Sequence, residues 1–261
     1  MKVWAVSNQK GGVGKTTTAV SLGGLLAEQG FKVLLLDLDP HGSMTSYFGD
    51  DPEDTGQRNT YHFFEMTSAA TKEDVLACVK STAVQGMSFI PASTALATLE
   101  RQMVGKSGMG LKVNQALSLI KQDFDYVIID SPPVLGVLMI NALAACHLLL
   151  VPVQTEFLAI KGLERMLRTC EMVVKSQQKS FDYLIVPTMF DRRTHASTAS
   201  LRELRNTYHS TIWPSMIPID TRFRDASQAG LPISFYDPNT RGAEAYRSLL
   251  KFLSQAKKSA A

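Results

Sequence analysis

The residues best suited to chemistry stand together near the amino end, where Lys10 to Thr17 read KGGVGKTT. In the ordinary phosphate-binding loop, G-x-x-x-x-G-K-[ST], glycines turn the backbone so that successive N–H groups face phosphate oxygens. The lysine reaches the β- and γ-phosphates, and the hydroxyl binds Mg²⁺. Gly14, Lys15 and Thr16 fit this pattern, although Gln9 occupies the position of its first glycine. The segment predicts a nucleotide site.

Lys10 and Gly11 add two features that the ordinary loop lacks. Lys10 is a second fixed cation beside the turn, and Gly11 has no side chain. A cation in this place can reach a phosphate bound by another subunit, and glycine allows two backbones to approach closely. We therefore expect the nucleotide to be shared between two subunits.

Aspartates follow two of the apolar strands expected from the sequence. Asp37 and Asp39 come after residues 31–36, and Asp130 ends the run that begins at Tyr126. Ligands of open α/β sheets bind at the carboxyl edge of the strands, so the three carboxylates are expected to converge on the metal and the γ-phosphate. A lone aspartate at a strand end is more often a cap or turn residue. Three beside a phosphate loop favour the metal interpretation.

The elements that must position these groups alternate along the chain. Residues 3–7 are apolar and β-prone, residues 16–29 have helical spacing, Gly30 fits the position after a helix, and residues 31–36 resume as a buried strand. This βαβ unit places phosphates at the amino end of the helix. Further strands are expected at residues 87–91, 126–130, 147–153 and 183–187. The alternation predicts an α/β fold with a doubly wound, mostly parallel sheet, helices on both faces, and one domain over residues 1–261.

Composition argues against several other classes. The chain has 261 residues with 45% hydrophobic content, enough for one large core. No apolar run approaches the roughly 18 residues that a membrane-spanning helix needs, and no signal-peptide pattern precedes the first strand, so a cytoplasmic protein is expected. Iron–sulfur reductases on the same P-loop fold would want a cysteine after Asp130, but Cys78, Cys146 and Cys170 lie elsewhere and form no C-x-x-C pair. Buried structural thiols are expected instead.

Four segments together resemble the ParA/MinD family of deviant Walker-motif ATPases, namely residues 10–17, 37–40, 130–133 and 151–156. The resemblance covers most of the chain. It implies a deviant P-loop ATPase that uses ATP and Mg²⁺, forms an ATP-bound homodimer, and hydrolyses ATP slowly until a partner protein stimulates it.

The resemblance also implies roles for single residues. Lys10 would contact the nucleotide of the other subunit, Lys15 would bind the β- and γ-phosphates, and Asp39 would orient the attacking water. These three are the catalytic candidates. The other loop residues expected at the nucleotide are Gly11, Gly12, Val13, Gly14, Thr16 and Thr17. The expected Mg²⁺ site consists of Thr16 directly and of Asp37 and Asp130 through water.

Two further segments, residues 188–194 and Ile217–Pro218, resemble those that surround adenine in this family. The residues expected at the base are Met189, Pro218 and Asp220. The chain departs from the family here, because Ile219–Asp220 stands where Arg-Asn often follows Ile-Pro. The departure affects base contacts and any DNA contact that the arginine would make.

Residues 41–49, HGSMTSYFG, are most similar within the family to ParC, a ParA-like ATPase that places chemosensory arrays at cell poles. His41 itself occupies a position that is commonly Gln. A histidine here could tune the neighbouring Asp39 or be a tolerated polar turn residue, and the sequence leaves both open.

The charge of the chain is unevenly spread. Residues 187–261 contain eleven Lys/Arg and six Asp/Glu, whereas the residues before them contain sixteen and eighteen. Arg192, Arg222 and Arg224 are the candidates for a face that binds DNA without sequence preference, and a solvated, partly ion-paired surface is the equal alternative. MinD-like relatives end in a membrane-binding amphipathic helix, but the stripe from Ala243 to Leu253 is expected to pack on the body, without stable membrane insertion.

These observations favour an ATPase whose nucleotide-switched monomer–dimer cycle positions or partitions a cargo, either a chemosensory array or a plasmid or chromosome. The stimulating partner would be a ParB-like protein or a chemosensory adaptor, and the protein would lie at a pole or on the nucleoid. The alternatives are a metabolic or redox P-loop enzyme on the same fold and a MinD-like membrane-associated regulator.

Overall fold

A computed structural model describes residues 1–54, 56–103, 108–177 and 182–256 of the chain. Its centre is a seven-stranded sheet with the order β3-β4-β2-β5-β1-β6-β7, in which only the pairing of β3 with β4 is antiparallel. The strands are β1 (Lys2–Val6), β2 (Val33–Asp37), β3 (Lys80–Ser81), β4 (Met87–Ile90), β5 (Tyr126–Asp130), β6 (Leu148–Gln154) and β7 (Asp182–Thr188). Lys257 and Lys258, which were counted in the charge of residues 187–261, lie outside the described residues.

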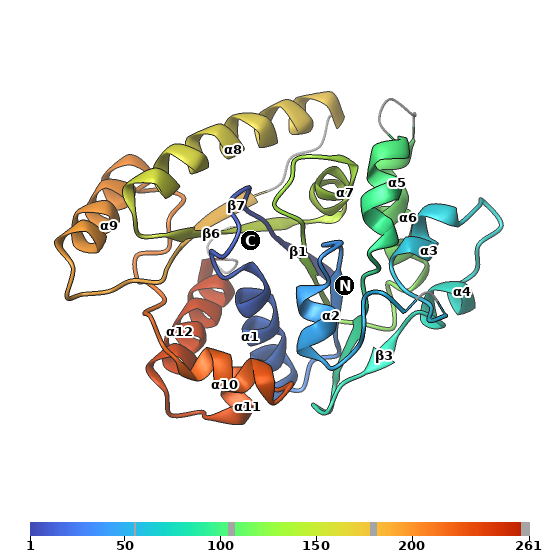
Figure 1. Ribbon diagram of the computed structural model, residues 1–261, viewed down its shortest axis with the longest axis horizontal. Helices are drawn as coiled ribbons and strands as arrows, with labels where there is room; N and C mark the ends of the chain where they lie inside the picture. Colours follow the sequence, from blue (N-terminus) through green and yellow to red (C-terminus); the bar gives the residue numbers. More distant parts are fainter. Residues whose placement is uncertain (55, 104–107, 178–181, 257–261) are drawn as a thin grey trace.

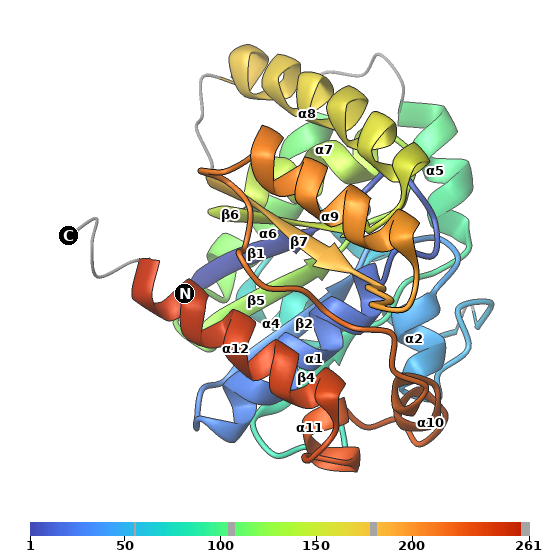
Figure 2. The same cartoon turned by 90° about the vertical axis from the view of Figure 1, so that its left-hand side faces the viewer.

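Helices cover both faces of this sheet (Figures 1 and 2). On one face lie α5 (Ala95–Met103), α6 (Lys112–Leu119), α7 (Val137–Ala145), α8 (Phe157–Gln177) and α9 (His195–Thr207). The opposite face carries α1 (Lys15–Glu28), α10 (Arg222–Gln228), α11 (Ile233–Tyr236) and α12 (Arg241–Ala256). Short helices α2 (Ser43–Tyr47), α3 (Tyr61–Glu65), α4 (Lys72–Leu76) and the 3₁₀ turn Met109–Leu111 complete the described chain. The expected doubly wound α/β fold is confirmed.

The central strands are buried on both faces, which explains why their sequences are continuously apolar. Every residue of β2 is buried, and β5 exposes only part of Tyr126. Two apolar clusters result, one on each face of the sheet. The short edge strand β3 was not predicted, because two residues with polar neighbours carry no periodic signal.

The last helix packs on the body of the protein. Ala243, Tyr246, Leu249 and Leu253 are all buried, in the same apolar cluster as the apolar side chains of α1. The Tyr246 hydroxyl also bonds that of Thr18 on α1, at 2.9 Å. The apolar stripe is therefore core surface, as expected, and none of the described helices is long and apolar enough to span a membrane.

Candidate nucleotide and magnesium site

The loop between β1 and α1 has the backbone that phosphate binding requires. Gly12 and Gly14 have φ angles of 71° and 89°, in the left-handed region that glycine adopts without strain. Two neighbouring strands hold the loop in place. Asn8 Nδ2 donates to the carbonyl of Pro152 at 2.7 Å, and Thr188 Oγ1 donates to the carbonyl of Val13 at 2.9 Å. The loop thus leads into α1, whose first N–H groups have no partner within the helix and favour an anion.

The three expected Mg²⁺ residues are brought together at the carboxyl edge of the sheet. Asp37 and Asp130 are register partners on the paired strands β2 and β5, and Thr16 Oγ1 donates to Asp130 Oδ2 at 2.5 Å. Because its proton points at Asp130, the Thr16 oxygen keeps its lone pairs for a cation. The second oxygen of Asp130, Oδ1, is buried without a hydrogen-bond partner among the described residues.

This donor set fits Mg²⁺, which prefers oxygen ligands and usually keeps several waters and phosphate oxygens around it. Across the described ranges no three His, Cys, Asp or Glu side chains gather into a metal site of their own. Thr16, Asp37 and Asp130 would therefore hold the ion only together with the phosphates. The ion would neutralise charge on the β- and γ-phosphate oxygens.

Burial has a strong electrostatic effect on the two aspartates. It raises the pKa of Asp37, and burial together with the neighbouring charge of Asp37 raises that of Asp130. Lys15 is buried beside them and opposes the shift at Asp130, as does the hydrogen bond from Thr16. One lysine does not balance two buried carboxylates, so the site favours an added cation.

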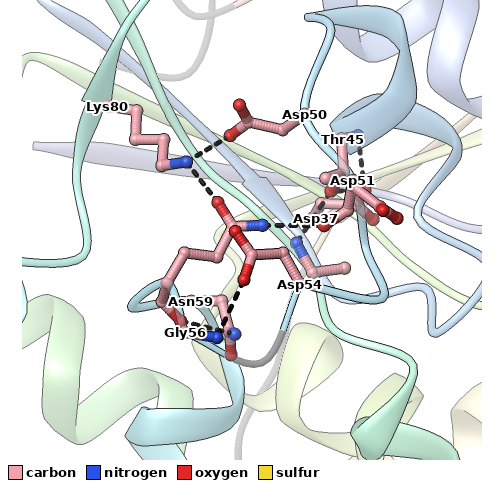
Figure 3. Close-up of polar contacts among 10 residues, drawn as sticks. Asp37, Thr45, Asp50, Asp51, Asp54, Gly56, Asn59 and Lys80 are labelled. Atoms are coloured by element: carbon pink, nitrogen blue, oxygen red, sulfur yellow. Dashed lines mark hydrogen bonds and ion pairs between the residues drawn. The ribbon is translucent and has the colours of Figure 1, made fainter.

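Thr45 is a site residue that the sequence analysis did not single out. Its backbone N–H and its hydroxyl both donate to Asp37 Oδ2, at 2.9 and 2.8 Å (Figure 3). The same hydroxyl accepts a hydrogen bond from the backbone N–H of Ala92 at 2.8 Å. The carbonyl of Thr45 accepts one from the backbone N–H of Asp50 at 3.1 Å. Asp50 in turn pairs with Lys80 at 2.6 Å. Asp37 is thus oriented by a network that extends to the edge strand β3.

Lys10 is held within its own subunit. Its ammonium forms an ion pair with Glu156 and donates to Gln154 Oε1 at 3.2 Å. Both partners belong to the end of β6 and the turn after it, and the Lys10 and Glu156 side chains are 36% and 39% exposed. The resemblance implied a contact with the other subunit, so Lys10 must leave Glu156 to make it. Sequence reasoning missed this partner, although Glu156 closes one of the quoted segments.

A cavity of about 480 Å³ adjoins the loop on the side expected for the base. Met189 and Pro218 line it, and Met189 has a φ of 52°, which is uncommon for a residue with a side chain. Asp220 also lines the cavity, but its two carboxylate oxygens accept hydrogen bonds from the backbone of Arg222 and Gly242, both at 3.0 Å. Its side chain therefore joins this segment to α12. The remaining walls come from Val13, Gly14, Thr17, Thr188, Ile217, Ile219, Phe223, Arg224, Ser227 and Tyr246.

The three DNA candidates lie in different surroundings. Arg224 lines the cavity just described, and Arg192 lines a neighbouring cavity of about 600 Å³ together with Arg193 and Arg241. Arg222 forms ion pairs with Asp225 of α10 at 3.2 Å and with Asp237, which directly follows α11, at 3.7 Å. All three arginines are exposed, and the two cavities share Pro218, Ile219 and Asp220 in their walls.

The chain is similar to several known proteins over most of its length. A family model described as an AAA domain matches residues 1–183. The chain is 39% identical over 253 residues to the sporulation initiation inhibitor protein Soj of Bacillus subtilis, covering 96% of this chain and 97% of Soj. It is 35% identical to the chromosome partitioning protein ParA of Caulobacter vibrioides, over 96% of this chain and 93% of ParA. A solved structure of cobyrinic acid a,c-diamide synthase from Mycobacterium smegmatis, with bound ATP analogue and magnesium, has a TM-score of 0.83 and 34% identity, covering 100% of this chain and 97% of that chain.

Lys15→Ala is expected to abolish measurable ATP binding while the protein stays folded. Loss of a buried cation at the phosphates should weaken affinity by about 100-fold or more, since hydrogen bonds to charged groups contribute about 1.5–3 kcal/mol and the charge adds to this. Isothermal titration calorimetry with Mg–ATP measures the change. The exposed Lys121→Ala variant is the control, and unchanged affinity in a folded Lys15→Ala variant would contradict the assignment.

Asp130→Asn is expected to raise the melting temperature of the nucleotide-free protein at pH 8 and to abolish turnover. The folded-state pKa of Asp130 lies above its ordinary value of 3.8, so this carboxyl makes the fold lose stability as pH rises above that value. A gain of 1 kcal/mol corresponds to about 2–4 °C for a chain of this size. Scanning fluorimetry should show a larger gain at pH 8 than at pH 5. A variant that melts below wild type at pH 8 would refute the expectation.

Proposed function

This chain belongs to the ParA/Soj family of ATPases, and we propose that its ATP-bound form is a dimer whose assembly and hydrolysis position or partition a cargo. Its cofactors are ATP and Mg²⁺. The observation that carries the proposal is Lys10, a second lysine at the rim of the phosphate loop whose ammonium pairs with Glu156 and Gln154 in the single subunit.

The surface around Lys10 supports a dimer. Val134 and Leu135 follow β5 and are 59% and 41% exposed, and Phe157 and Leu158 follow β6 and are 61% and 72% exposed. The two strands flank β1, so these apolar side chains lie at the same edge of the sheet as the loop. Exposed apolar side chains gathered at one edge are typical of an interaction site. A second copy would cover them while it receives Lys10.

Within this dimer, each of the expected catalytic residues has a separate task. Lys15 binds the β- and γ-phosphates of its own subunit, and Lys10 neutralises charge on the nucleotide of the other. Asp39 orients the attacking water. Hydrolysis then releases the dimer, so the lifetime of the ATP state acts as a timer, and a stimulating partner shortens it.

The names of the relatives support partitioning as the class of process. Soj and ParA are named for sporulation control and chromosome partitioning. Residues 41–49 support the narrower alternative, a ParC-like protein for a chemosensory array with a polar position and a chemosensory adaptor as partner. A chromosome or plasmid cargo would instead require a ParB-like partner and a nucleoid location.

A metabolic or redox enzyme on the same fold remains the second candidate, because the solved structure with 34% identity is named as a cobyrinic acid a,c-diamide synthase. Its chemistry finds little support in this chain. Cys78, Cys146 and Cys170 are all buried, and burial raises the pKa of Cys78 and Cys170 to about 11. None of them is a ready nucleophile or an exposed cluster ligand.

Gly11→Val is expected to bind Mg–ATP normally but to remain monomeric. Apart from the two neighbouring residues, no described atom lies within 4 Å of a Cβ built on Gly11, so the single subunit tolerates the side chain. Two branched side chains at a close backbone approach should weaken the dimer by about 100-fold or more, since overpacking costs about 1–3 kcal/mol per site. Light scattering with ATP is the measurement. Gly11→Ala should show a smaller loss, and a Gly11→Val dimer as stable as wild type would exclude the sandwich arrangement.

Non-specific DNA is the matrix that we propose for the ATP dimer, because the basic excess lies in residues 187–261. The double variant Arg192→Glu/Arg241→Glu tests DNA binding separately from nucleotide binding. These two arginines line a cavity outside the base pocket, whereas Arg224 lines the base pocket itself. The gel shift of duplex DNA should vanish, and the salt slope should fall by about one for each arginine that no longer binds a phosphate.

Arg101→Glu/Lys121→Glu carries the same change in net charge on exposed positions of α5 and the turn after α6, and it should keep the shift. Turnover should be unchanged in both variants. Liposome sedimentation with ATP and no DNA shift at low salt would instead favour the MinD-like membrane mechanism.

A further inference from the structure

The side chain of His41 is hydrogen-bonded to one oxygen of the Asp39 carboxylate. Nδ1 of the imidazole lies 2.9 Å from Asp39 Oδ1, and the backbone N–H of His41 donates to the same oxygen at 3.0 Å. We propose that His41 is a positioning residue for hydrolysis, which fixes Oδ1 so that Oδ2 faces the attacking water. The inference rests on the role proposed for Asp39.

A tight turn brings the imidazole to the carboxylate. The backbone N–H of Gly42 donates to the carbonyl of Asp39 at 2.8 Å, with Pro40 at the second position of the turn. Gly42 has a φ of 60°, and a Cβ there would lie 2.5 Å from Pro52 Cβ, so the turn is packed against the next loop. The backbone at His41 is therefore held by the turn, and the bond to Asp39 Oδ1 holds the ring.

The two hydrogen bonds differ in what they reveal. An aspartate at the first position of a turn commonly accepts from the backbone two residues later, whatever that residue is. Only the bond from Nδ1 depends on histidine. A carboxylate oxygen can only accept a hydrogen bond, so Nδ1 of His41 must carry the proton. The other ring nitrogen, Nε2, then faces solvent.

The exposure of the pair shows why this bond matters for the free oxygen. The Asp39 side chain is 11% exposed and that of His41 is 77% exposed, so the imidazole occupies the solvent side of an almost buried carboxylate. Within the described part of the chain, Asp39 Oδ2 makes no hydrogen bond. A carboxylate held at one oxygen by two donors keeps the other in a fixed direction, as the orientation of a water nucleophile requires.

Three substitutions at position 41 test the proposal. His41→Ala should lower kcat by about 5- to 10-fold, the effect of one partly exposed hydrogen bond to a charged group. KM for ATP, dimer formation and melting temperature should not change. His41→Asn should recover most of kcat, because its amide nitrogen can lie close to the position of Nδ1. His41→Gln should recover less, because its amide nitrogen lies one bond further from the backbone. His209→Ala, at an exposed histidine after α9, is the control and should behave as wild type.

A double-mutant cycle with Asp39→Ala separates this inference from its premise. Asp39→Ala should trap the ATP dimer and slow turnover by about 100-fold or more, and His41→Ala should add nothing in that background. An unchanged kcat in His41→Ala beside an impaired Asp39→Ala would overturn the inference alone. So would an equal loss in both backgrounds, or a loss of ATP affinity or stability in His41→Ala. Normal turnover of Asp39→Ala would refute the role of Asp39, and this inference with it.

Discussion

Asp37 and Asp130 end two paired strands at the same register position, where the sheet buries both carboxylates beside a single buried lysine. Burial raises the pKa of each, so the nucleotide-free protein contains a pair of groups that resist full ionisation. A magnesium ion with its phosphates supplies the positive charge and oxygen ligands that this pair lacks. The free energy of nucleotide binding therefore depends on the charges at this edge of the sheet. Without ligand, the two buried carboxylates make the fold less stable than apolar side chains at the same positions would.

The neighbouring contacts transmit the state of this edge to the surface. Thr45 holds Asp37 by two hydrogen bonds, and Asp39, two residues after Asp37, leads into the turn that carries His41. Asp37, a candidate metal-site residue at the end of β2, and Asp39, the proposed water-orienting group, thus lie two residues apart where the chain leaves β2 toward α2. A shift of Asp37 on metal binding would displace Asp39 as well, because the backbone N–H of Asp39 donates to Asp37 Oδ1 at 3.1 Å.

Lys10 provides the second coupling. In the single subunit its charge is compensated by Glu156, at the turn between β6 and the exposed apolar residues that open α8. Release of this ion pair and burial of those residues are two parts of the same proposed dimerisation. The pair is partly exposed, so it contributes little stability and can be exchanged for an interaction with phosphate without a large penalty.

The sequence by itself determined the layers of the fold and the candidate residues for phosphate and metal. Continuous apolar strands alternating with helices leave few arrangements other than a parallel sheet covered on both faces, and a glycine loop after a strand places its lysine and hydroxyl by local geometry alone. The contacts of these residues were decided only by the tertiary structure. Thr45 reaches Asp37, Glu156 reaches Lys10, and Asp220 is used to join two segments, because each partner comes from a different strand end or loop. Sequence spacing fixes a direction within one element, but the distance between side chains on separate elements depends on how the sheet and its helices pack, and no local pattern encodes that.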